Sequence, residues 1–326
     1  MRPAKIAVLA AALLLALPAY AQDDAPLGER LVDQMNQLFG RHPGLRAMHA
    51  KGVVVEGTFT PSPEAATLST ASLFQGGTTP VTARFSDGTG LPMIPDGDPN
   101  ANPHGLGLRF QLADGGQLDM VTNSLPFFPV ADGETFLALL QAVAASGPGT
   151  PKPTPLERFV ADHPSVPAAT GGLATPAGYG RETYNGINAF VLVDAKGERR
   201  PVRLRLDPVA GDADLGREEA AKQPPDFLAD GLIADLAKEP VRFRLLAQLA
   251  AQGDQTTDPS KPWPADRPLA LLGEIALTRP AADQAAAARD LMLLPSNLTD
   301  GIEPSDDPMI DVRDETYAVS FSRRSE

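Results

Sequence analysis

The chain has 326 residues, no cysteine and a formal net charge of −13. A negative charge of this size disfavours binding to nucleic acid or to anionic lipid. The absence of cysteine excludes disulfides, a thiolate nucleophile and cysteine metal ligands. The composition, 43% hydrophobic with 33 prolines, predicts a substantial core divided by many loops, since proline is present at twice its usual share of about 5%.

The N-terminus has the pattern of a secretory signal peptide. Arg2 and Lys5 precede an apolar run over 6–17, and Ala19-Tyr20-Ala21 offers small residues for cleavage. We predict a signal peptide over 1–21 and one mature domain over 22–326. No later run approaches the roughly 18 apolar residues of a membrane helix. We therefore expect an exported, periplasmic protein without membrane insertion.

The first half of the mature chain predicts a helix followed by short strands. Residues 27–39 carry apolar side chains at helical spacing. The β-branched residues over 52–60 predict a strand. The same reasoning predicts strands over 81–86, 106–112 and 118–122 and a helix over 135–145.

The second half resumes strand material after an irregular stretch. Residues 147–178 scatter Pro, Gly, Ala and Thr without an apolar period, and we expect an irregular crossing there. A hairpin follows over 188–206. We further predict an exposed charged stretch over 212–222, helices over 227–237, 241–251 and 281–294, and a strand over 269–278. Together these elements predict an α+β fold, an antiparallel β-barrel with surrounding helices.

Common catalytic motifs are missing from the sequence. It holds no G-x-S-x-G elbow, no P-loop and no H-E-x-x-H, and no two histidines have metal-ligand spacing. Gly105-Leu-Gly107 begins a dinucleotide-binding pattern, but Phe110 stands in place of its third glycine.

Two local patterns suggest chemistry. If residues 307–320 form a helix, Arg313 and Tyr317 lie one turn apart on the same face. A guanidinium held against a phenol oxygen favours the phenolate, which is a competent axial ligand for ferric haem. His49 stands at the entrance of the strand over 52–60, between two basic residues. Taken alone, each pattern has a commoner explanation, a surface Arg–Tyr contact and a strand-edge histidine.

Five motifs occur in one order along the chain. They are R-x-x-H-A-K-G (46–52), A-R-F-S (83–86), D-x-V-x-N with P-F-F (119–128), D-P-S-K-P-W-P (258–264) and N-L-x-x-G-I-E-P-S (297–305). In this order they resemble the catalase superfamily. The chain is most similar to the short, secreted catalase-related peroxidases, because it ends soon after Tyr317 without the long C-terminal extension of full catalases.

The resemblance implies a non-covalent haem b and a role for each matching residue. His49 resembles the distal histidine, Asn123 the distal asparagine, and Ser86 the serine that holds the histidine ring. Tyr317 resembles the iron ligand and Arg313 its charge partner. The remaining matches are Arg46, Arg84 and Arg324 to the arginines that bind the haem propionates, and Phe128 and Phe136 to phenylalanines beside the haem.

The chain departs from the family pattern at three places. Met48 precedes the histidine where full catalases usually have valine, and Pro129 replaces a phenylalanine. At the C-terminus two arginines are adjacent, Arg323 and Arg324, so the sequence leaves open which of them meets a propionate.

The resemblance implies a peroxidase that reduces hydrogen peroxide or organic hydroperoxides with a small-molecule electron donor and dismutates little. A true catalase is the alternative within the enzymes, and a haem-carrying barrel without turnover is the alternative outside them. The pair of His49 and Asn123 argues against a carrier, which needs the iron ligand but not the distal pair. The sequence leaves the donor, the preferred peroxide and the oligomeric state open.

Overall fold

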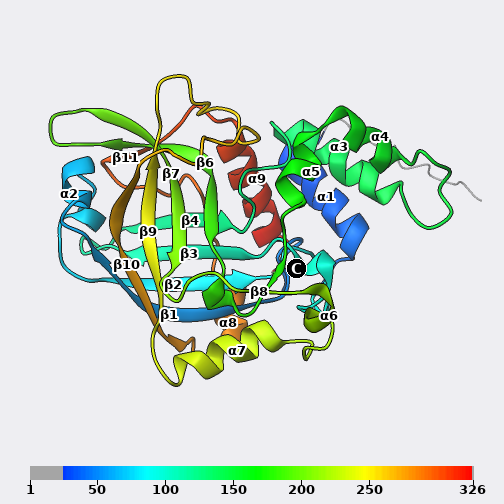
Figure 1. Ribbon diagram of the computed structural model, residues 1–326, viewed down its shortest axis with the longest axis horizontal. Helices are drawn as coiled ribbons and strands as arrows, with labels where there is room; N and C mark the ends of the chain where they lie inside the picture. Colours follow the sequence, from blue (N-terminus) through cyan, green and yellow to red (C-terminus); the bar gives the residue numbers. More distant parts are fainter. Residues whose placement is uncertain (1–24, 325–326) are drawn as a thin grey trace, which may run out of the picture.

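The computed structural model describes residues 25–324, so the predicted signal peptide lies outside the described residues. Eight antiparallel strands close into a barrel (Figure 1). Around the ring they are β1 (Gly52–Pro61), β2 (Thr79–Ser86), β3 (Gly105–Gln111), β4 (Gln117–Asn123), β6 (Tyr184–Val193), β7 (Arg199–Pro208), β9 (Val241–Leu249) and β10 (Leu269–Pro280). The predicted α+β barrel is confirmed.

Short elements complete the sheet and the loops. Strand β11 (Ile302–Pro304) pairs with β6, and β5 (Thr175–Pro176) pairs with β8 (Asp214–Leu215). The short helices and 3₁₀ turns are α2 (Ala65–Leu68), η2 (Ser72–Phe74), η3 (Pro99–Ala101), α4 (Pro155–Asp162), α5 (Ser165–Thr170), η4 (Tyr179–Arg181) and α6 (Arg217–Ala220).

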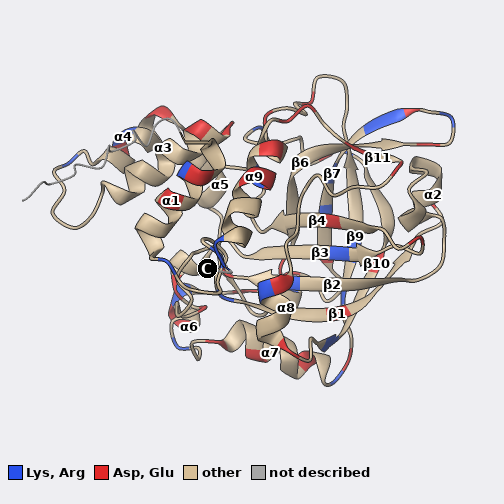
Figure 2. Cartoon of the chain, turned by 180° about the vertical axis from the view of Figure 1, so that it is seen from behind, with Lys and Arg blue, Asp and Glu red and all other residues tan. Residues whose placement is uncertain are grey.

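The barrel interior is the main hydrophobic core. Phe59 and Phe110 meet there edge to face, with ring centroids 5.5 Å apart. Burying one such ring is worth about 1.5–3 kcal/mol. Charged residues are few on strands β1 to β4 and β6 (Figure 2), whereas half of the residues of β7 are charged. Helix α7 (Phe227–Leu236) packs three leucines at helical spacing against this core.

A second apolar cluster lies outside the barrel, among α1 (Leu27–Phe39), α3 (Gly133–Ala144) and α9 (Met309–Ser322). Its buried members are Leu31, Val32, Met35, Ala47, Leu137 and Leu140. In Figure 1, α9 lies between the barrel and α1. None of the described helices is long and apolar enough to cross a membrane.

Three sequence-based predictions of local structure were wrong. Residues 241–251, predicted helical, form strand β9, because Val241, Phe243 and Leu245 alternate with two arginines at the period of a strand. The stretch over 147–178 contains α4 and α5 where no regular structure was expected. The signal for α4 was a capping box, in which Thr154 and Glu157 exchange side-chain and backbone hydrogen bonds.

The third error concerns 281–294, where only Gln284–Asp290 is helical (α8). This helix lies over the outer face of β1. The Gln284 side chain accepts a hydrogen bond from Val54 N and donates one to Val54 O, at 2.8 and 2.6 Å. Since β1 is covered on both faces, its run of valines over 53–55 is continuous rather than alternating.

Candidate active site

A cavity lies between strands β2–β4 and helix α9. It encloses about 840 Å³ of space between atoms, its open mouth included. Eight of the ten predicted site residues line it: Arg46, His49, Arg84, Ser86, Asn123, Arg313, Tyr317 and Arg324. Of the two adjacent arginines, Arg324 lines the cavity, whereas Arg323 forms an ion pair with Asp33 on α1 at 2.5 Å.

The other two predicted residues lie elsewhere. Phe128 and Phe136 contact each other, with ring centroids 5.1 Å apart, and neither is among the residues that line the cavity. Phe136 packs against the second apolar cluster, as does Met48. Met48 also lines the cavity. The contact of the two phenylalanines with a haem stays a prediction.

One side of the cavity, which we call the strand wall, consists of His49, Ser86 and Asn123. His49 Nδ1 lies 3.1 Å from Ser86 Oγ, so the hydroxyl orients the ring. The other ring nitrogen, Nε2, has no hydrogen-bond partner within residues 25–324. The backbone of His49 is left-handed, with φ 55°, a conformation that a non-glycine residue adopts only where its surroundings enforce it.

His49 is held in its neutral form. Burial, together with the guanidiniums of Arg84, Arg46 and Arg313, lowers its pKa to about 3. Both causes disfavour the imidazolium. At neutral pH the ring can therefore accept a proton, which is the state that a general base requires.

Two glycines on β3 make room for the strand wall. A Cβ on Gly105 would lie 2.9 Å from Ser86 Oγ and 3.0 Å from His49 Nδ1. A Cβ on Gly107 would lie 2.4 Å from the Leu293 side chain. The Gly105-Leu-Gly107 sequence therefore serves close packing beside the cavity.

Asn123 ends strand β4 and pairs with Gly105 across the sheet. Its Oδ1 accepts a hydrogen bond from Leu125 N at 2.9 Å. This bond fixes the orientation of the amide, because a backbone N–H needs an acceptor. The Asn123 side-chain nitrogen is thereby left as a donor for a molecule in the cavity.

The opposite side, which we call the helix wall, consists of Arg313 and Tyr317 on α9. Arg313 Nε donates to the Tyr317 hydroxyl at 3.1 Å, as the spacing of four residues predicts. Arg313 also donates to Asn188 Oδ1, and Asn188 Nδ2 donates to Asp307 Oδ2 at 2.7 Å. A chain of hydrogen bonds thus runs from the phenol to a buried carboxylate. Neither Asn188 nor Asp307 was predicted from the sequence as a site residue.

Arg46, Arg84 and Arg324 form an arginine cluster at the cavity. Their hydrogen bonds within residues 25–324 all go to backbone carbonyl oxygens. Nε of both Arg84 and Arg324 is buried without a partner. Burial, with Arg84 and Arg324 as neighbours, lowers the pKa of Arg46 to about 7. Since arginine keeps its proton in proteins, this group of three positive charges favours the binding of an anion.

Comparison with known proteins agrees with this arrangement. The catalase family model matches residues 30–325. A catalase-related peroxidase of Mycolicibacterium paratuberculosis is 34% identical over 301 residues, which cover 91% of this chain and 94% of that protein. A catalase-related peroxidase of Synechococcus elongatus is 34% identical over 91% of this chain and 88% of its own length.

Full catalases match over less of their length. A catalase of Pseudomonas syringae is 32% identical over 84% of this chain, but the match covers 56% of that protein. The similarity therefore extends over most of this chain and is shared with both the short and the long relatives. On these grounds the chain belongs to the catalase family.

Proposed function

We propose that this protein is a haem peroxidase that reduces hydrogen peroxide or organic hydroperoxides with an external electron donor. One observation carries the proposal. A neutral histidine, His49, and a phenol, Tyr317, share a cavity with an arginine cluster that forms no ion pair with a carboxylate of residues 25–324. The names of the two catalase-related peroxidases support the same activity.

The cofactor in this proposal is haem b, with Tyr317 as the axial ligand. The residues present fit such a group, because the arginine cluster offers unpartnered donors to two propionates and charge-assisted bidentate pairs are the strongest of such contacts. Arg313 holds the Tyr317 oxygen from the side. When bound, the haem supplies the redox-active iron that the protein itself lacks.

The residues of the strand wall transfer protons to and from the peroxide. Neutral His49 takes a proton from the incoming peroxide and returns it to the departing oxygen, first as general base and then as general acid. Ser86 keeps the ring in place at 3.1 Å. The Asn123 side-chain nitrogen donates a hydrogen bond to a peroxide oxygen, which stabilises charge as the O–O bond breaks.

The donor is a small molecule that reaches the cavity through its open mouth. We further propose that the protein is exported to the periplasm, as the N-terminal sequence predicts. The two alternatives, a true catalase and a haem carrier, differ from the proposal in turnover. A catalase releases oxygen from peroxide without a donor. A carrier neither releases oxygen nor oxidises a donor.

The experiment is to purify the mature protein, measure its haem content and absorbance spectrum, and then compare peroxide-dependent dye oxidation with oxygen release. We expect one haem per chain, a high-spin ferric spectrum with a tyrosinate ligand, and dye oxidation faster than oxygen release. Absence of haem would refute the proposal. Faster oxygen release would favour the true catalase, and haem without turnover would favour the carrier.

A further inference from the structure

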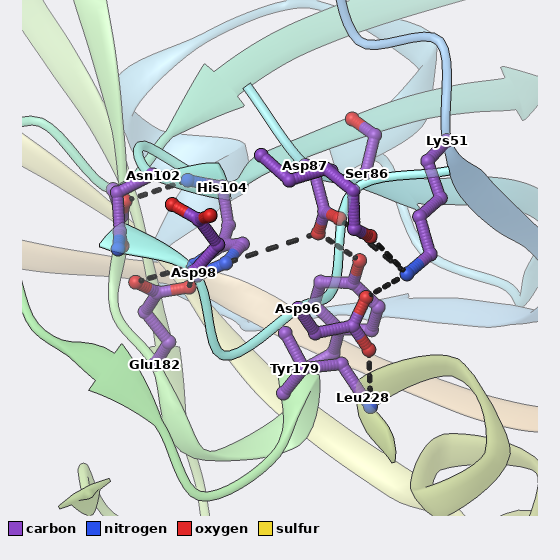
Figure 3. Close-up of polar contacts among 12 residues, drawn as sticks. Lys51, Ser86, Asp87, Asp96, Asp98, Asn102, His104, Tyr179, Glu182 and Leu228 are labelled. Atoms are coloured by element: carbon purple, nitrogen blue, oxygen red, sulfur yellow. Dashed lines mark hydrogen bonds and ion pairs between the residues drawn. The ribbon is translucent and has the colours of Figure 1, made fainter. Parts of the chain in front are cut away.

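A buried group of charged residues lies behind the strand wall. We call Lys51, Asp87, Asp96, His104 and Glu182 the ion cluster (Figure 3). Asp87, Asp96 and His104 are fully buried, and the Lys51 side chain is 12% exposed. None of the five lines the cavity. Burying charges is costly unless they are paired, so a cluster of this size needs a reason.

Three of its members lie beside Ser86 of the strand wall or beside the residues that pair with Ser86. Ser86 pairs with Gly52 on one side and with Gly105 on the other. Lys51, Asp87 and His104 are the residues next to these three at the same end of the barrel, and Asp87 N extends the ladder by donating to Lys51 O at 3.2 Å. Ser86, the last residue of β2, and Asp87, which follows it, point to opposite sides in Figure 3, as successive residues of an extended chain do.

The ion cluster joins these strand ends to the surrounding loops. The Lys51 ammonium contacts Asp96 Oδ1 and lies 2.9 Å from Asp226 Oδ1, and it donates to Pro225 O at 2.8 Å. Asp96 Oδ2 accepts from Leu228 N, in the first turn of α7, at 2.7 Å. The segment that carries His49 is thereby tied to α7.

A second set of contacts holds the end of β2. The Tyr179 hydroxyl donates to Asp87 Oδ1 at 2.9 Å, and the Tyr179 ring stacks on Phe85 with centroids 5.2 Å apart. His104 Nδ1 forms an ion pair with Glu182 at 3.1 Å. Asp87 lies between Lys51 Nζ and His104 Nε2, 3.9 Å from each.

From this geometry we propose that the ion cluster is a positioning device for the strand wall. Ionised Asp87, held between Lys51, Tyr179 and His104, fixes the end of β2 and with it Ser86. Ser86 in turn holds the ring of His49, whose left-handed backbone needs such support. Asp87 and Lys51 are thus positioning residues that act on the reaction through Ser86 and His49.

Asp87 is the member of the ion cluster that we expect to lose its charge on mild acidification. Burial and the neighbouring Asp96 raise its pKa to about 6, against the opposing influence of His104, Tyr179 and Lys51. Arg84, three residues earlier on β2, also interacts electrostatically with Asp87. Since His49 itself titrates near pH 3, a change in the site near pH 6 would belong to the ion cluster and not to His49.

The test compares Asp87→Asn, which keeps the shape of the side chain, with Asp254→Asn. Asp254→Asn is the control, because it removes a partly buried ion pair in the loop over 250–268. In that pair Asp254 Oδ2 lies 2.7 Å from Arg267 Nε. For Asp87→Asn we expect a loss of about tenfold to a hundredfold in kcat/KM for peroxide, which is the scale of effect that a misplaced catalytic group produces. The KM for the donor should stay unchanged.

The pH profile separates positioning from a general loss of structure. In the wild type the rate with peroxide should fall on acidification through about pH 6, and this limb should be missing from Asp87→Asn. Lys51→Arg should keep the limb near the same pH, whereas Lys51→Met should move it to higher pH, because the Lys51 ammonium lowers the pKa of Asp87. A wild-type profile that is flat through pH 6, or an equal loss in Asp254→Asn, would overturn the proposal.

The activity readouts rest on the proposed function, so a second readout is needed that does not. The chain has four histidines, so the imidazole ¹⁵N signals of the full chain can be assigned, using the diamagnetic ferrous carbonyl form where haem is bound. We expect Asp87→Asn to shift the His49 signals and Asp254→Asn to leave them in place. Unshifted His49 signals in Asp87→Asn would overturn the proposal even if peroxidase activity were absent.

Discussion

The helix wall comes from a single turn of α9, whereas the strand wall is gathered from three segments of the chain. Arg313 and Tyr317 meet because a helix places residues four apart on one face. His49 and Ser86 are 37 residues apart and meet only through the register of β1 and β2. A slip of one residue in that register would turn Ser86 away from the cavity.

The difference shows where each wall is vulnerable. The helix wall needs only a formed helix and one support from the barrel, Asn188. The strand wall depends on the barrel register, on the lack of a side chain at Gly105 and on the ion cluster behind it. A change outside the cavity should therefore affect the strand wall more than the helix wall.

The largest expected effect comes from the helix wall. Tyr317→Phe removes the oxygen that Arg313 holds at 3.1 Å, and we expect the haem content of the purified protein to fall close to zero. Tyr184→Phe is the matched control, since that buried hydroxyl donates to Tyr179 O inside the barrel. Retention of the wild-type spectrum by Tyr317→Phe would remove this residue from the iron site.

His49→Gln should separate the two walls. It removes the proton acceptor of the strand wall but leaves the helix wall intact, so haem content should persist. The rate with peroxide should fall by about 10²–10⁴, the usual value of a general base. His163→Gln is the control, because that ring stacks on Phe159 away from the cavity. Equal rates for wild type and His49→Gln, measured by stopped flow, would contradict the base assignment.

A smaller effect is expected from Asn188→Ala, which breaks the chain between Arg313 and Asp307. Burial already raises the pKa of Asp307, and Asn188 opposes this rise. Loss of the bond should cost about 1–3 kcal/mol in the free energy of unfolding, measured by urea denaturation. Asn100→Ala, at an exposed position of η3, should cost little. Similar losses of stability in both variants would show that the hydrogen bonds of Asn188 to Arg313 and Asp307 do not stabilise the fold.

The last expected effect is the pH dependence that His49 contributes to stability. Its pKa is lowered from 6.5 to about 3 in the folded protein, so between these values the unfolded state binds more protons. The wild type should therefore lose stability relative to His49→Gln as the pH falls below 6.5, by at most about 1.4 kcal/mol per pH unit. Parallel curves for the two proteins in urea titrations from pH 7 to pH 4 would contradict the neutral, buried state of His49.

Much of the fold could be predicted from the sequence, because the patterns that indicate helices and strands are local. The apolar period over 27–39 and the valine-rich run over 52–60 each predicted the element that the structure contains. The error at 241–251 has a local cause as well. Leu245-Leu246-Ala247 follows the alternating start of β9 without a break, and such an apolar run fits a helix as well as a strand.

The residues of the candidate site likewise fall into those that local patterns predicted and those that they did not. The pairing of Arg313 with Tyr317 follows from spacing alone, and the ordered motifs indicated the residues that line the cavity. Nothing in the sequence marked Asp87, His104 or Asn188, since each is an ordinary polar residue beside a glycine or within an apolar strand. Their partners are 78 to 125 residues away or lie across a closed barrel.

The sequence by itself therefore determined the barrel strands other than β9, the longer helices and the helix wall, because helix and strand periodicity act over a few residues. Only the tertiary structure decided how His49 is held, which of Arg323 and Arg324 lines the cavity, and that five charged residues are buried behind the strand wall. Strand pairing brings the ends of β1, β2 and β3 together, and packing of the surrounding loops excludes water from them; neither is encoded at any one position.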